Sequence, residues 1–139
     1  MAIHVLTDVS VSFNSVDLSD HVRSVTVSMS SEDVDITAMG ADSRAHAPGL
    51  RDDRVEIEWL QDYATSKVDQ TLSTYVGNAT GATLLVKPVN TTVSSTNPSY
   101  SMTAILLDYQ PIAGTVGEAN TVTTTFLPAA GSSITRATT

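Results

Sequence analysis

Two runs of alternating residues, separated by a long irregular segment, constrain this chain more than any other part of its sequence. In the first run Val34 and Ile36 alternate with polar neighbours, and in residues 55–59 Val, Ile and Trp alternate with glutamates. A repeat of two places apolar side chains on one face of an extended backbone, so each run predicts a half-buried strand. The segment between them, residues 38–54, contains two glycines and shows neither a helical nor a strand period. Connections of this length are uncommon inside compact domains unless they are functional or disordered, so we expect this loop to contact a partner.

The same alternation predicts strands on both sides of this segment. These strands share short apolar runs bounded by Gly, Pro, Asn, Asp or Ser, and they are residues 9–13, 25–29, 82–89, 102–109 and 122–126. The polar residues 30–33 predict a turn, and therefore a hairpin between the strand at 25–29 and the strand at 34–36. Both phases of residues 102–109 contain apolar side chains, so we expect that strand to be covered on both sides.

One segment has a helical period instead. Apolar residues recur at intervals of three or four across residues 64–76, which predicts a helix at about 64–76. Ser66 and Asp69 have the spacing of an N-terminal capping box. Gly77 follows directly and is expected to end the helix in a left-handed conformation.

Together these patterns predict a mainly β protein, a β-sandwich or split barrel of six to eight strands with one flanking α-helix at about 64–76. A chain of 139 residues has the length of one domain. We expect a β domain over residues 1–127, in which residues 38–54 form the long loop. Residues 128–139 are small and polar, and we expect them to form a flexible C-terminal arm.

Charge and composition argue against several classes of function. The formal net charge is −8 and only 7 residues are Lys or Arg, which opposes nucleic-acid binding by phosphate neutralisation. Cysteine is absent, and the 3 histidines lie far apart without the spacing of metal ligands. Nucleotide-binding and hydrolase motifs are also absent. We therefore expect no catalytic residue, no metal and no cofactor, and a protein that is not an enzyme.

The N-terminus has no basic and apolar leader, and no apolar run in the sequence approaches the length of a membrane span. We therefore expect a soluble protein that is assembled in the cytoplasm and has no membrane partner. Trp59 shares the apolar phase of its strand, so we expect it to anchor the core and not to stack on a ligand.

The order of elements around the long loop resembles a known family. A strand of the D-I-T type, a glycine, an isolated Arg44, a Pro-Gly-Leu at 48–50, an acidic turn and a strand ending near Asp62 follow one another. This order is similar to that of the major tail tube proteins of long-tailed, siphovirus-like bacteriophages. The resemblance runs from about Val9 to Leu127 and includes the late segment PIAGTVGEANTVTTTF.

The resemblance implies a structural virion protein, the repeating subunit of a phage tail tube. It implies hexameric rings that stack head to tail, in which the sheets of six subunits join into one inner barrel around an acidic channel. Its implied partners are further copies of the same chain, a tape measure protein, an initiator and a terminator. DNA would be only transient, non-specific cargo in the lumen, and the protein would be located in the virion tail after assembly in the host cytoplasm.

Within this interpretation, two groups of residues are candidates for assembly contacts. The loop would reach an adjacent ring, where arginine side chains offer several donors to carboxylates. The inter-ring candidates are Arg44, Pro48, Gly49, Leu50, Arg51, Asp52, Asp53 and Arg54. The polar faces of the strands would line a water-filled channel that repels DNA phosphates. The lumen-face candidates are Ser24, Thr26, Ser28, Asp33, Asp35, Glu56 and Glu58, which equally fit the solvated face of a monomer.

Two other functions stay open at this point. The chain fits another tail or neck component on a related fold, such as a tail terminator or the inner tube of a contractile device. A terminator would stop at one ring, whereas a tube subunit makes long stacks. The chain also fits a non-viral β-sandwich that binds carbohydrate, which would be monomeric and would need a concave aromatic or calcium-dependent site. The four tyrosines are dispersed in the sequence and favour no such site.

Overall fold

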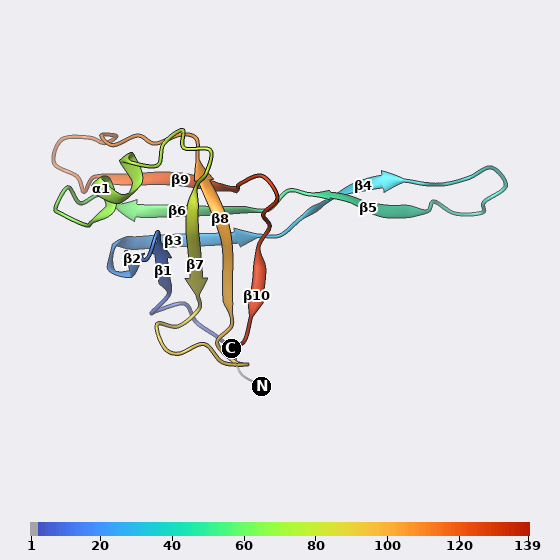
Figure 1. Cartoon of the computed structure of the whole chain (residues 1–139), viewed down its shortest axis with the longest axis horizontal. Helices are drawn as coiled ribbons and strands as arrows, with labels where there is room; N and C mark the ends of the chain where they lie inside the picture. The colour runs from blue at the N-terminus through green and yellow to red at the C-terminus, as the bar shows by residue number, and fades with distance from the viewer. Residues whose placement is uncertain (1–2) are drawn as a thin grey trace.

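The structure is a computed structural model that describes residues 3–139. In that range it contains ten β-strands and one short α-helix, arranged as a β body from which a long two-stranded hairpin projects (Figure 1). The strands of the body are β1 (Ser10–Phe13), β2 (Val16–Asp17), β3 (Val22–Ser28), β6 (Arg54–Leu60), β7 (Ala82–Lys87), β8 (Ser99–Leu106), β9 (Thr121–Pro128) and β10 (Thr135–Ala137). The remaining elements are the hairpin strands β4 (Ser31–Asp35) and β5 (His46–Arg51), the 3-10 turn η1 (Ser19–His21) and the helix α1 (Val68–Ser73).

The strands of the body form one antiparallel sheet that folds over on itself. Its hydrogen-bonded order is β2-β1-β7-β8-β9-β6-β3, and β10 pairs with the start of β8. The pairing of β8 with β9 is confined to residues 104–106 and 126–128, and the sheet bends there. As a result β3, β6 and β9 run across the direction of β7 and β8 (Figure 1). The prediction of a mainly β, sandwich-like fold with a flanking helix is confirmed.

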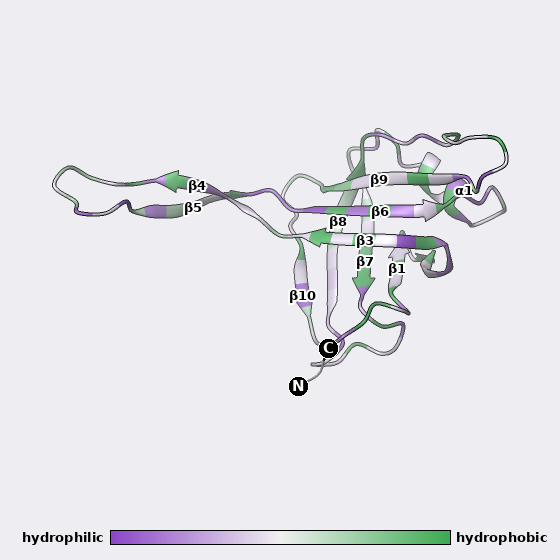
Figure 2. Ribbon diagram, turned by 180° about the vertical axis from the view of Figure 1, so that it is seen from behind, coloured by the Kyte–Doolittle hydropathy of each residue, from purple (hydrophilic) through white to green (hydrophobic). Residues whose placement is uncertain are grey.

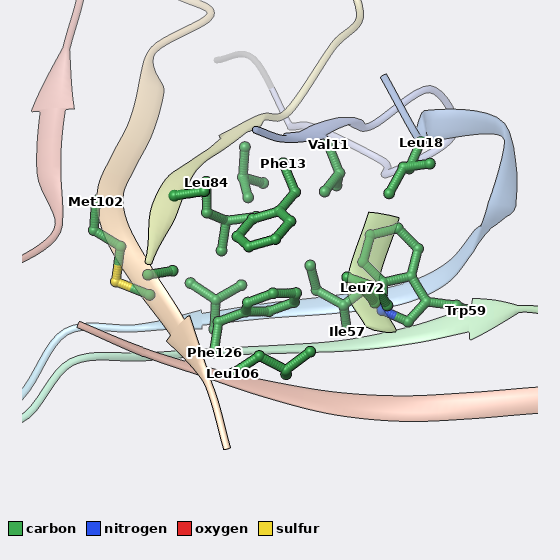
Figure 3. Packing of buried hydrophobic residues seen from close by; sticks show 14 of the residues in the cluster. Val11, Phe13, Leu18, Ile57, Trp59, Leu72, Leu84, Met102, Leu106 and Phe126 are labelled. Atoms are coloured by element: carbon green, nitrogen blue, oxygen red, sulfur yellow. The ribbon is translucent and has the colours of Figure 1, made fainter. Parts of the chain in front are cut away.

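The core lies between the two halves of this sheet. Val55, Ile57 and Trp59 of β6 point inward and are buried, as their alternation predicts. Phe126 of β9 meets Phe13 of β1 with ring centroids 5.1 Å apart (Figure 3). Aromatic pairs of this kind contribute about 0.5–1.5 kcal/mol beyond the area that they bury. The contact therefore ties the two halves of the sheet together.

The only tryptophan has a buried polar partner. Trp59 Nε1 donates a hydrogen bond to Thr124 Oγ1 at 2.8 Å, and both side chains are almost fully buried. Thr124 lies on the inward face of β9 beside β6, so its hydroxyl is placed where the indole N–H needs an acceptor. Trp59 is thus a core anchor, as expected, and Thr124 is an inward-facing polar residue whose hydroxyl accepts the hydrogen bond of the buried indole.

The expected hairpin between residues 25–29 and 34–36 is wrong. β3 pairs with β6, and β4 pairs with β5. Ser30, which lies in the predicted turn, instead continues the ladder: the Asp52 amide donates to the Ser30 carbonyl at 2.8 Å, and the Ser30 hydroxyl donates to the Asp52 carbonyl at 2.7 Å. The ladder of the body therefore continues directly into the projecting hairpin. Polar composition alone does not separate a turn from an exposed strand.

The helix is shorter than the predicted 64–76. α1 covers only Val68–Ser73, and Ser66 has a φ of 61°, a left-handed conformation that ends any helical run. The side chain of Ser66 makes no capping hydrogen bond to the helix, so the predicted capping box is absent here. Gly77 does adopt the left-handed conformation, with a φ of 76°. The helix still places Val68 and Leu72 in the core.

The C-terminal segment is part of the body. Residues 135–137 form β10 on the edge of β8, and the Ile134 side chain is buried in the core cluster. The expectation of a flexible arm over residues 128–139 is therefore corrected. A single apolar residue in a polar segment has no periodicity, which is why the sequence pattern does not reveal this anchor.

We predict that Thr124→Val destabilises the protein by about 1–3 kcal/mol, because it removes the hydrogen-bond acceptor of a buried indole N–H while conserving side-chain volume. Urea unfolding monitored by tryptophan fluorescence measures the free energy of unfolding. Thr123→Val is the matched control, because Thr123 is exposed on the other face of the same strand. Equal free energies for the two variants would contradict the role of the Trp59–Thr124 hydrogen bond.

Candidate assembly surfaces

The projecting hairpin has an uncovered apolar face. Val34 and Ile36 of this hairpin are 42% and 57% exposed, although their alternation is that of a half-buried strand. Val34 lies opposite Ala47, and a Cβ on Gly49 would approach Val34 Cγ2 to 2.9 Å, so the Val34 side chain lies over the glycine. Figure 2 shows a green, apolar patch on β4 well outside the body. These side chains make the hairpin a candidate contact surface.

The opposite face of the hairpin is polar and internally paired. His46 Nδ1 lies 2.7 Å from an Asp33 oxygen, and Arg44 donates to Asp35 at 2.7 Å. Hydrogen bonds from Thr37, together with the one from Arg44, hold the pKa of Asp35 below its ordinary value. These cross-strand pairs fix which face of the hairpin is polar and which is apolar.

A two-stranded hairpin alone is marginally stable in water, because it buries little apolar surface. β4 and β5 pair with each other, and neither pairs with a strand of the body. Met39 near the tip and Leu50, which lies on the other face of β5 with Pro48, are further exposed apolar side chains in the single chain. The hairpin would therefore gain stability when a partner covers it.

The predicted structureless loop 38–54 is corrected by this geometry, because residues 46–51 form β5. Pro48 and Gly49 hide this strand from sequence analysis, since both are depleted in strands. Pro48 is tolerated because each strand of a two-stranded hairpin has a free edge. Of the inter-ring candidates, Arg44 lies near the tip, and Pro48, Gly49, Leu50 and Arg51 lie along β5.

Asp53 is not a surface contact, and this candidate is corrected. Its side chain is fully buried at the root of the hairpin. Its carboxylate accepts hydrogen bonds from the Ile134 amide at 2.8 Å, from Arg51 Nη2 at 2.7 Å and from the Ser30 amide at 3.2 Å. Burial raises the pKa of Asp53, but these donors outweigh it and the pKa lies below its ordinary value. The neighbouring candidates Asp52 and Arg54 are exposed and pair with each other at 3.1 Å.

The structure brings five of the seven lumen candidates together on one face of the body. Across β3 and β6, Ser24 lies opposite Glu58, Thr26 opposite Glu56 and Ser28 opposite Arg54. On the next strand, Thr123 and Thr125 lie opposite Glu58 and Glu56 on the same outward face. These two threonines were not predicted, although their alternation with Val122 and Phe126 was the available signal. The result is a continuous hydroxyl and carboxylate surface over β3, β6 and β9.

Asp33 and Asp35 do not belong to this surface, because they lie on the hairpin. On the polar face itself, Glu58 is 3.8 Å from Arg23, and Arg54 is paired with Asp52. Among the ion pairs found in residues 3–139, Glu56 takes part in none. The net negative charge of the face therefore comes from Glu56.

The sheet that carries this polar face has two open edges. β3 is the last strand in the hydrogen-bonded order. At the other side, β8 pairs only with residues 126–128 of β9, so the backbone of residues 121–125 has no strand partner on that edge within the described chain. Open edges are templates for pairing with another chain.

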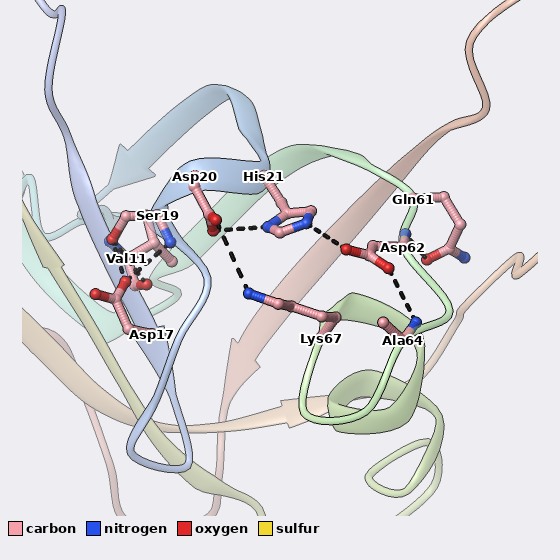
Figure 4. A network of polar contacts seen from close by, with 9 residues as sticks. All are labelled: Val11, Asp17, Ser19, Asp20, His21, Gln61, Asp62, Ala64 and Lys67. Atoms are coloured by element: carbon pink, nitrogen blue, oxygen red, sulfur yellow. Dashed lines mark hydrogen bonds and ion pairs between the residues drawn. The ribbon is translucent and has the colours of Figure 1, made fainter.

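A polar network lies beyond the end of β6 that is far from the hairpin root. The His21 ring nitrogens lie 2.7 Å from Asp20 and 2.7 Å from Asp62 (Figure 4). The Ala64 amide donates to Asp62, and this bond and the contact with His21 hold the pKa of Asp62 below its ordinary value. The network connects η1 to the turn before α1. Residues 3–139 contain no group of three His, Asp or Glu placed to hold a metal.

Within the described residues, no helix has both the length and the apolar character needed to cross a membrane. No family model and no curated protein matches the sequence.

Solved structures do share this fold. A chain from the virion of a native gene transfer agent particle has a TM-score of 0.71 and 14% identity, over 92% of this chain and 95% of that chain. A chain from the C6-symmetric tail of an empty gene transfer agent particle gives 0.65 and 14%, over 83% and 82%. The SPP1 tail tube gives 0.74 and 11%, over 99% and 80%.

The chain therefore has the tail tube fold, and the resemblance to tail tube proteins is confirmed at this level. At such low identities the likeness extends to the fold alone.

We predict that Asp53→Asn lowers stability by about 2–3 kcal/mol at pH 7, because a buried, charge-assisted hydrogen-bond acceptor is weakened. The folded-state pKa of Asp53 is depressed, so its contribution is fully present above the unfolded value of about 3.9 and is lost as pH falls through the folded value. The difference in melting temperature between wild type and variant should therefore shrink below about pH 4. Thermal unfolding from pH 2 to 8 measures it.

Asp52→Asn is the matched control, because the Asp52 side chain is 60% exposed. We expect this variant to follow the wild-type curve at every pH. A deficit for Asp53→Asn that persists unchanged at pH 2 would contradict the role of the ionised carboxylate.

Proposed function

We propose that this chain is the repeating subunit of a phage-type tail tube, a structural protein of the virion tail and not an enzyme. The observation that carries this proposal is the projecting hairpin with an uncovered apolar face on a body with the tail tube fold. In a monomer such a hairpin exposes apolar side chains to water, whereas in a polymer a neighbouring copy would bury them. We place assembly of the tube in the host cytoplasm, as expected from the sequence.

Rings would form through the open edges of the β3-β6-β9 sheet. The two edges are different surfaces of the chain, so joining one to the other in a neighbouring copy is a head-to-tail contact. Such a contact closes into a ring when its rotation fits. The C6 symmetry of one structure with this fold supports six copies per ring. The joined sheets would then form one inner barrel without exposed edges.

Stacking of rings would use the hairpin. Val34 and Ile36 would be covered by the body of a copy in the next ring, and Arg44 near the tip would contact carboxylates there. This contact is also head-to-tail but does not close, so it produces an open stack. The other inter-ring candidates on β5 would contribute along the length of the hairpin.

The polar face over β3, β6 and β9 would line the channel. Its hydroxyls are neutral, its arginines are paired, and Glu56 gives each subunit one uncompensated negative charge in that face. Repeated around a ring, these charges repel phosphates, so DNA would pass without being held. DNA would be transient cargo, and the proposed protein partners are a tape measure, an initiator and a terminator, with no membrane involved.

The direct test is negative-stain electron microscopy of the concentrated protein, with light scattering on the same sample. Stacked rings or hollow tubes are expected. Single rings that never stack would favour a terminator instead. A strictly monomeric protein that stays monomeric when seeded with tail initiator complexes would overturn the proposal.

We predict that the double variant Val34→Glu/Ile36→Glu folds and forms rings but does not stack. Removing two apolar side chains from the contact costs on the order of 3 kcal/mol, which raises the concentration needed for tubes by roughly 100-fold. Electron microscopy and sedimentation of tubes measure this concentration. Leu107→Glu/Ile112→Glu is the matched control, because it adds the same charges at exposed apolar residues outside the hairpin. Normal tubes from the hairpin variant would contradict the stacking role.

We also predict that Glu56→Lys/Glu58→Lys tubes bind short duplex DNA, whereas wild-type tubes do not. Reversing two charges per subunit makes the lumen basic, and binding should weaken steeply as salt rises. Co-sedimentation of labelled DNA with assembled tubes measures the effect. Asp108→Lys/Glu118→Lys carries the same charge change at exposed residues outside the polar face. Equal DNA binding by both variants would show that this face does not line the channel.

A further inference from the structure

Three segments that are distant in sequence meet at one buried carboxylate. Asp53 accepts hydrogen bonds from Ser30, where β3 continues into β4, and from Arg51 at the end of β5. Its third partner is the Ile134 amide, 81 residues away, at 2.8 Å. Arg51 Nη2 also approaches the Ile134 carbonyl at 3.5 Å. Both strands of the hairpin root and the C-terminal segment are therefore held by the same side chain.

This arrangement makes the geometry of the hairpin root and the docking of the C-terminal segment depend on each other. A fully buried carboxylate needs its donors, because burying a charge without partners is strongly unfavourable. If the Ile134 segment leaves, Asp53 loses its shortest backbone donor and is exposed to water. Its bonds to Ser30 and Arg51 then compete with solvent, and the hairpin root loses its fixed geometry.

At its root the hairpin is also held by two bonds between Ser30 and Asp52, of 2.8 Å and 2.7 Å, but these join its two strands to each other and not to a third element of the body. β4 and β5 pair only with each other, and a two-stranded ribbon that leaves a sheet is free to bend where it leaves. The C-terminal segment in turn is held on β8 by three residue pairs of β10 and by the buried Ile134 side chain. Two hydrogen bonds with Thr103 hold its beginning: the Ala129 amide donates to the Thr103 carbonyl at 2.8 Å, and the Thr103 amide donates to Ser132 Oγ at 3.0 Å. Short elements of this kind open locally before the rest of a domain.

We propose that Asp53 is a positioning residue that couples the docking of the C-terminal segment, residues 129–137, to the direction of the hairpin. The hairpin keeps its projecting direction only while Ile134 is docked against the body. The functional meaning of this coupling rests on the proposed role of the hairpin in stacking, but the coupling itself is a property of the single chain.

Linked equilibria are reciprocal, so docking of the C-terminal segment and the direction of the hairpin would each influence the other. Any copy or partner that takes residues 135–137 away from β8 would release the hairpin, and fixing the hairpin on another ring would hold Ile134 in place. The C-terminal segment would thus control whether a subunit is ready to stack.

The absence of cysteine from the chain allows a direct test. Met39→Cys at the hairpin tip and Thr125→Cys on β9 carry two spin labels, and electron paramagnetic resonance measures the distance between them in the full-length monomer. We expect a narrow distance distribution in the otherwise wild-type chain. Asp53→Asn should widen the distribution at least twofold, and Ile134→Ser should widen it equally by acting from the far side of the contact.

The matched controls are Asp52→Asn and Arg136→Ala, which change exposed neighbours in the same two segments. Both should leave the distribution narrow. Circular dichroism confirms that each labelled variant is folded, and Ile134→Ala replaces Ile134→Ser if the latter unfolds.

Each outcome is decisive for the coupling. A distribution that is already broad in the otherwise wild-type chain, or one that stays narrow in Asp53→Asn, overturns it. Widening by Asp53→Asn but not by the Ile134 variant also overturns it, because Asp53 would then hold the root without the C-terminal segment. Electron microscopy of wild-type protein tests tube formation separately, so a chain that shows coupling and never forms tubes refutes only the proposed function.

Discussion

The rest of the structure depends on the register of β6. Val55, Ile57 and Trp59 fill the core, which forces Glu56 and Glu58 to the opposite face. A slip of one residue would reverse both faces and bury the glutamates, so the register is strongly determined. Because β3 and β9 pair with β6 on either side, their serines and threonines are placed beside those glutamates. The polar face is therefore a direct consequence of how the core is packed.

The projecting hairpin is an extension of two strands of the body. β3 and β6 leave the body together and continue as β4 and β5, and the change occurs at Ser30, Asp52 and Asp53. Inside the body, alternation buries the apolar side chains against a second layer. The hairpin has no second layer, so its alternating Val34 and Ile36 are exposed; they are out of phase with the inward residues of β3 because the register shifts between Ser31 and Asp33. Alternation thus gives a core in the two-layered body and an uncovered apolar face in the hairpin.

The sequence pattern predicts some of these elements and misses others. Local alternation predicts β3, β6 and β9 and most of the polar face, because it reports which side chains share a face. It does not report which strands pair, and the wrong β3–β4 hairpin follows from that. Pro48 and Gly49 conceal β5, and Ile134 is a lone anchor. Asp53 looks like one member of a solvated charge cluster, since its burial comes from a segment 81 residues away.

In the proposed tube, the balance between charge and apolar surface would suit controlled polymerisation. A net charge of −8 keeps separate copies apart, and the uncovered face of one hairpin is small. A single hairpin contact is therefore weak, whereas a preformed ring presents several such contacts at once. Once the first contact forms, the others become intramolecular and act at a high effective concentration. In the proposed tube, rings would stack far more readily than free subunits would associate, so growth would proceed from an existing ring and not from monomers in solution.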